Sequence, residues 1–143
     1  MNARRYEDWP ERLDAFFASR RHAEFAYGVH DCCLFAADAV EAITGIDPAS
    51  EFRSTYHSRF GSLRRLRQTC GRASLAIAVA AIFSRLNFPV ITPNCAGRGD
   101  VVLLTLPSGE TLCVISLAGE AVAASASGFI VLPRALVRAA WKI

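Results

Sequence analysis

The sequence predicts an α+β domain, because helical patterns fill roughly its first two thirds and strand patterns fill the rest. Before Asp100 the apolar residues recur at helical spacing, and after it runs of β-branched residues alternate with Gly- and Pro-containing turns. Helices followed by an antiparallel sheet are typical of the α+β class. The chain has 143 residues and shows no repeat, linker or low-complexity tract, so we expect one domain spanning residues 1–143.

The first helix is expected from about Trp9 or Pro10 to Arg21. Proline is favoured in the first turn of a helix, where its missing N–H costs nothing. Leu13, Phe16 and Phe17 then form an apolar stripe. This pattern indicates an amphipathic helix that packs through one face.

The second helix is expected over Cys32–Thr44, with Asp31 as its N-cap and Gly45 as its C-terminal glycine. Its residues are apolar on nearly every side, apart from Asp38 and Glu41, which we expect together on one exposed edge. A helix of this composition is usually buried at the centre of a domain.

Two further helices are expected at Ser62–Gln68, which is rich in arginine, and at Ser74–Leu86, which is rich in alanine. The arginines could contact phosphates, but a solvated helix face with Leu63 and Leu66 turned inward explains them better. Pro89 and Pro93 should bracket an irregular connection.

The last third predicts a β-hairpin and then shorter strands. The hairpin strands are expected at Val101–Leu106 and Thr111–Leu117, around a turn at Pro107–Glu110. Ala121–Ala124 and Phe129–Leu132 are the next candidates, and Pro133–Trp141 fits a short helix or a strand.

Composition excludes several classes of protein. With 52% hydrophobic and 20% charged residues the chain is neither disordered nor a coiled coil nor collagen-like. Its net charge of +3 falls short of the dense basic surface of a nucleic-acid binder, so we expect no specific nucleic-acid partner. The longest apolar run, Leu75–Phe83, is about half of the roughly 18 residues that cross a bilayer, which predicts a soluble protein without a membrane span.

The five cysteines are expected to be free thiols in a reducing compartment, because the start of the chain lacks the apolar core of a signal peptide. Their adjacent or isolated spacing does not fit a zinc site, and we expect no metal and no cofactor.

Cys32 is the candidate nucleophile. A cysteine in the first helical turn lies where the helix dipole and free backbone N–H groups stabilise a thiolate. Cys32 and Cys33 both meet that condition, and the alternative is that both simply fill space as small apolar residues.

The motifs around this helix resemble those of NlpC-type cysteine peptidases and amidases. Phe25, Tyr27 and Gly28 match the family's aromatic turn, and Asp31-Cys32 match its nucleophile pair. Leu34-Phe35, Thr44-Gly45 and the Gly-Asp of Arg98–Val102 match later positions. The resemblance implies a papain-like fold, in which N-terminal helices, including a central buried one, pack on a small antiparallel sheet.

In more detail the chain resembles a family of phage and prophage proteins of unknown function. Thr44–Pro48 and Trp141 match its Thr-Gly-x-Asp-Pro motif and its C-terminal tryptophan. The resemblance implies a tail-associated protein in the virion or the host cytoplasm, with other phage tail proteins as partners and a peptide or cell-wall fragment as a possible ligand. It also implies that Tyr27 and Asp31 lie at the binding site.

The chain departs from the active members of the peptidase family. They carry a histidine base and then a polar residue at places that correspond to Thr111–Val114 and Ala121–Ala124, where this chain has no histidine. We therefore expect a catalytically degenerate protein that acts in structure or assembly.

Two other hypotheses remain open at this point. One is an active cysteine hydrolase, a peptidoglycan endopeptidase or amidase, with Cys32 as nucleophile and His30 or His57 as a substitute base. The other is a binding module with an exposed groove beside Cys32, rimmed by Tyr27 and His30.

Overall fold

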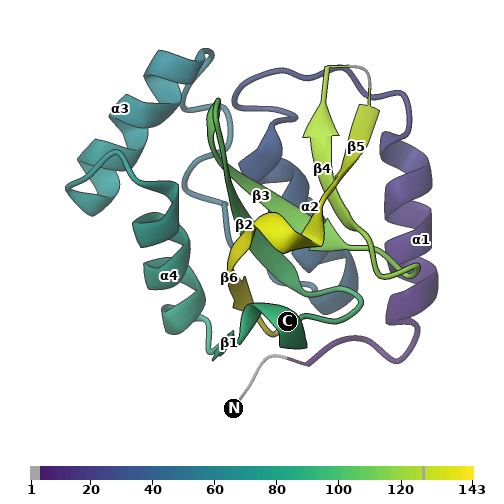
Figure 1. The fold of residues 1–143 in the computed structure, drawn as a ribbon. Helices are drawn as coiled ribbons and strands as arrows, with labels where there is room; N and C mark the ends of the chain where they lie inside the picture. The colour runs from purple at the N-terminus through teal and green to yellow at the C-terminus, as the bar shows by residue number, and fades with distance from the viewer. Residues whose placement is uncertain (1–3, 127) are drawn as a thin grey trace.

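The computed structural model describes residues 4–126 and 128–143. In these residues it shows four α-helices packed on a six-stranded antiparallel sheet (Figure 1), which confirms the α+β class. The helices are α1 (Trp9–Arg20), α2 (Cys32–Thr44), α3 (Arg59–Cys70) and α4 (Leu75–Arg85). The strands are β1 (Val90–Ile91), β2 (Val101–Leu106), β3 (Gly109–Ile115), β4 (Ala121–Ser125), β5 (Gly128–Leu132) and β6 (Val137–Trp141), in the sheet order β1-β6-β2-β3-β4-β5.

Helix α2 is the central element, as its composition predicts. It contacts β3 and β4 on one side and α1 on the other. The Asp31 side chain caps its first turn, and Gly45 ends it with a φ of 79°, a left-handed conformation that suits glycine. The expectation of one exposed acidic edge is wrong for Asp38, whose carboxylate is mostly buried because Arg20 and Arg53 form ion pairs with it.

The sheet buries side chains on both faces. One face packs on the helices, with Val101, Leu103, Leu112, Val114 and Trp141 in the main core. The alternate residues of the same strands, among them Val102, Leu104, Cys113, Ile115 and Ala140, form a second apolar cluster. Strands buried on both faces read as continuous apolar runs, which is why β2 shows no polar alternation.

Two predicted segments need correction. Helix α3 is longer than Ser62–Gln68, because the Ser58 side chain accepts a hydrogen bond from the Gly61 N–H and starts the helix earlier. None of its described residues is fully buried, and Leu63 remains 38% exposed instead of turning inward completely. The connection after Pro89 contains a strand, β1, which pairs with the distant β6.

The region Pro133–Trp141, left open between helix and strand, contains both. A short 3₁₀ helix at Arg134–Leu136 leads directly into β6, which pairs with β1 and β2. None of the helices in the described ranges combines the length and the apolar character that a bilayer-spanning helix requires.

Candidate functional site

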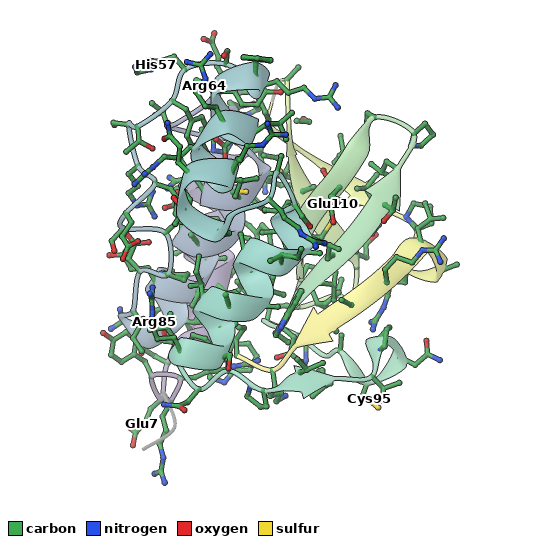
Figure 2. The ribbon with its side chains drawn as sticks, turned by 90° about the vertical axis from the view of Figure 1, so that its left-hand side faces the viewer. Glu7, His57, Arg64, Arg85, Cys95 and Glu110 are labelled. Atoms are coloured by element: carbon green, nitrogen blue, oxygen red, sulfur yellow. The ribbon has the colours of Figure 1, made fainter. Side chains whose placement is uncertain are left out.

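A cavity of about 470 Å³ lies where the start of α2 meets α3, α4 and β3. Helices α3 and α4 face the viewer in Figure 2, with the sheet to their right, and provide one wall. The Phe25–Tyr27 turn, Cys32 and Cys33 line another part, and Thr111 and Leu112 contribute from β3. We call this space the Cys32 cavity. Most of its other lining side chains are apolar, as is typical of small-molecule sites.

Cys32 is the first residue of α2 and is half-buried against β3. The hydrogen bond from the neighbouring Cys33 thiol is the main cause that lowers the pKa of Cys32 to about 7. Burial opposes this shift, and hydrogen bonds from the Leu112 backbone and the Thr111 hydroxyl add to it. The same pairing, together with burial, raises the pKa of Cys33. Of the two candidates in the sequence, Cys32 is therefore the one that carries thiolate at neutral pH.

Asp31 fixes the start of α2. Its carboxylate accepts hydrogen bonds from the Gly28 and Leu34 N–H groups, both at 2.9 Å, and from the Tyr56 hydroxyl at 2.6 Å. Burial and this bond to Asp31 both raise the pKa of Tyr56. Asp31 is only 3% exposed and does not line the cavity, so the structure gives this proposed binding residue a positioning role.

Tyr27 lies on the wall of the Cys32 cavity. Its ring packs edge-on against Phe25, with 4.9 Å between the ring centroids. Gly28 follows with a φ of 83°, and a Cβ atom there would collide with the Tyr56 carbonyl oxygen. The Tyr-Gly pair thus allows the loop to fold tightly over residue 56 before α2 begins.

Neither His30 nor His57 lines the Cys32 cavity. His30 is 6% exposed and packs against the Phe35 ring at 6.0 Å between centroids. Its two imidazole nitrogens have no hydrogen-bond partner among the described residues. His57 is exposed at the periphery, beyond the end of α3 in Figure 2. No histidine lines the cavity in the described part of the chain. The groove that the binding hypothesis expects therefore has Tyr27, but not His30, on its wall.

Glu110 is a residue of this region that sequence reasoning missed. Its carboxylate accepts hydrogen bonds from the Leu75 and Ala76 N–H groups at 3.0 and 3.3 Å and so ties β3 to the start of α4. It lies between the helices and the sheet (Figure 2) and lines the cavity. Only the helix cap Ser74 could be inferred locally, because Glu110 is 35 residues away from Leu75.

The other thiols differ from Cys32 in their surroundings. Cys113 is buried in the second apolar cluster, where burial raises its pKa to about 12. Cys95 is exposed and does not line the Cys32 cavity, and Cys70 is half-buried at the end of α3. Among the described residues no three Cys, His, Asp or Glu side chains are grouped closely enough to hold a metal ion.

Comparison with protein families matches residues 4–143 to the family described as "Domain of unknown function (DUF6950)". Because the match covers nearly the whole chain, the protein belongs to this family. No curated protein matches the chain.

Proposed function

We propose that this chain is a phage or prophage tail-associated protein with an NlpC-type papain-like fold, catalytically degenerate and acting in structure or assembly. The order of the Tyr-Gly, Asp-Cys, Thr-Gly and Gly-Asp motifs supports this reading. A helix that begins with cysteine and packs on an antiparallel sheet also supports it. Other tail proteins are the proposed partners, in the virion or the host cytoplasm.

The observation that carries the degenerate reading is the surroundings of the Cys32 sulfur. Its neighbours on β3 are the Thr111 hydroxyl and the Leu112 backbone, and an active relative would place its imidazole in this region. A hydroxyl cannot accept the thiol proton at neutral pH or deliver it to a leaving amine. A positioned general acid or base contributes about 10²- to 10⁴-fold in rate, so amide hydrolysis loses at least that factor.

The geometry around Asp31 has a structural use that needs no catalysis. Asp31 joins the Gly28 turn, the first turn of α2 and the loop that carries Tyr56. The Cys32 and Cys33 side chains pack against the main core. These contacts keep the start of α2 in place whether or not the thiol reacts.

The experiment compares Cys32→Ala with the wild-type chain in two assays. We expect neither protein to release products from purified peptidoglycan fragments. In a phage or prophage genome that encodes the chain, we expect deletion to abolish intact tails and Cys32→Ala to support normal numbers of particles in electron micrographs. Normal tails after deletion, or tail loss with a correctly folded Cys32→Ala protein, would contradict the proposal.

One observation favours the second candidate, an active cysteine hydrolase. The pKa of Cys32, about 7, already provides thiolate at neutral pH without a neighbouring imidazole. Peptidoglycan cleavage by the wild-type chain that is lost in Cys32→Ala would establish this candidate. Loss of the same activity in His30→Gln or His57→Gln would identify the substitute base.

A further inference from the structure

The interior of the Cys32 cavity suits an aliphatic chain. Behind the thiol its walls carry large apolar side chains from three segments, including Phe52, Leu66, Val79, Ile82 and Phe83. A peptide placed there would bury N–H and C=O groups against carbon, which is unfavourable without hydrogen-bond partners. An unbranched hydrocarbon has no polar group to satisfy and gains from every methylene that it buries.

The missing base removes some reactions of a thiol but not all of them. Amide cleavage needs a proton donor for the departing amine, and release of an acyl-enzyme needs a base to activate water. Exchange between a thiolate and a thioester needs neither, because a free thiol has a pKa near 8.5 and leaves as the anion. Cys32 has the thiolate character that this exchange requires.

We propose that Cys32 accepts the acyl group of a long-chain acyl thioester and that the Cys32 cavity holds the acyl chain. The Cys32 sulfur attacks the carbonyl carbon, and the new C–S bond forms as the carbonyl electron pair moves to oxygen. When that pair returns, the C–S bond of the donor breaks and the donor leaves as a thiolate, which takes a proton from water. No water or oxidant is consumed.

The start of α2 can stabilise the intermediate. The first N–H groups of a helix have no intrahelical acceptor, and the Leu34 N–H is already used by Asp31. The Cys32 and Cys33 N–H groups also belong to this first turn, so they can donate to developing negative charge in the manner of an oxyanion hole. This contribution requires only the cap geometry that Asp31 maintains.

The inference rests on the proposed function at one point, because the absence of a base makes the acylated state persist. Without a group to activate water, the Cys32 thioester is the end product and not an intermediate. The acyl chain would then fill the cavity and cover the apolar walls of α3 and α4.

The test incubates the full chain with palmitoyl-coenzyme A or acetyl-coenzyme A and follows acylation by intact mass and peptide mapping. We expect one palmitoyl group on Cys32, released by neutral hydroxylamine, and a rate at least about tenfold higher than with the acetyl donor because the chain buries methylenes. Cys32→Ala should lose the modification. Cys95→Ala should keep it, because Cys95 is an exposed thiol outside the cavity.

A variant that narrows the cavity tests the role of the chain. Ala78 is a buried residue of α4 that lines the cavity, and Ala78→Leu places extra volume there. We expect a larger decrease in the rate of transfer from the palmitoyl donor than from the acetyl donor, in a protein whose thermal unfolding is still cooperative. An equal decrease in the transfer rate with both donors would overturn the proposal, and so would acylation of Cys95 as fast as that of Cys32.

Two results separate this inference from the proposed function. If palmitoyl-coenzyme A is hydrolysed with many turnovers, a base is present and the degenerate reading fails, although Cys32 still accepts the acyl group. If Cys32 is never acylated and peptidoglycan is not cleaved, the degenerate reading stands and the acyl-acceptor inference is wrong.

Discussion

Two buried aspartates organise this domain in parallel ways. Asp31 immediately precedes α2 and Asp100 immediately precedes β2. Each accepts a hydrogen bond at 2.9 Å from the N–H of a glycine three residues earlier, Gly28 or Gly97. Both therefore close a short turn and fix the start of the element that follows.

Their other partners differ in charge. Asp100 forms an ion pair with Arg5 at 2.8 Å and accepts a hydrogen bond from the Ile143 N–H, which ties both ends of the described chain to β2. The donors that Asp31 has among the described residues are all neutral, so no cation there offsets its charge. That charge works against the lowered pKa of Cys32 by raising it. The same turn is therefore used once to hold the fold together and once beside a reactive thiol.

The largest effect is expected for Asp100→Asn. It leaves the Arg5 guanidinium, which is mostly buried, without its carboxylate, and losing one partner of such a pair costs about 3 to 5 kcal/mol of the free energy of unfolding. Urea denaturation measures the loss. Asp8→Asn, at the exposed ion pair with Arg12, is the control and should leave the midpoint unchanged. If Asp100→Asn unfolds at the same urea concentration as the wild type, the charged partner of Asp100 does not make it more important for stability than Asp31.

Asp31→Asn should lower the free energy of unfolding by less, about 2 kcal/mol, because the partners of Asp31 are neutral and the amide oxygen can still cap the Leu34 N–H. It should also shift the reactivity of Cys32. The negative charge of Asp31 disfavours the thiolate, so its removal moves the pKa of Cys32 below about 7. The rate of alkylation by iodoacetamide as a function of pH measures this shift, and a midpoint that moved upward would contradict the charge argument.

Tyr56→Phe removes one of the donors to Asp31. A hydrogen bond to a charged group contributes about 1.5 to 3 kcal/mol, and we expect the lower end because Asp31 keeps two N–H donors. Thermal unfolding measures the difference. Tyr6→Phe is a suitable control, since the Tyr6 side chain is 41% exposed. Equal destabilisation by both variants would show that the Tyr56–Asp31 bond is not special.

The smallest effect on stability, and a clear one on reactivity, is expected for Cys33→Ala. Loss of the Cys33 donor should move the alkylation midpoint of Cys32 from about 7 toward the ordinary thiol value of about 8.5. Cys33→Ser keeps a hydroxyl donor at the same position and should retain most of the lowered pKa. If Cys33→Ala and Cys33→Ser titrate alike, the helix start and not Cys33 sets the pKa.

The local features of the fold could be predicted because their causes lie within a few residues. Asp31 caps α2 through Leu34, three positions away, and Gly45 ends the helix by its own backbone freedom. The β2–β3 hairpin follows from two apolar runs that flank a turn. The same reasoning missed β1, because its only partner, β6, lies some 50 residues further along the chain.

In the candidate site, too, local features could be predicted and long-range contacts could not. Residues 25–35 alone predict that a cysteine begins a buried helix after an aromatic-glycine turn, because these are local properties of that segment. Only the tertiary structure decided that Thr111 and Leu112 face that thiol, that Tyr56 bonds to Asp31, and that His30 and His57 lie outside the cavity wall. These contacts join residues that are 25 or more positions apart, and such pairings are set by how the core packs and not by local propensity.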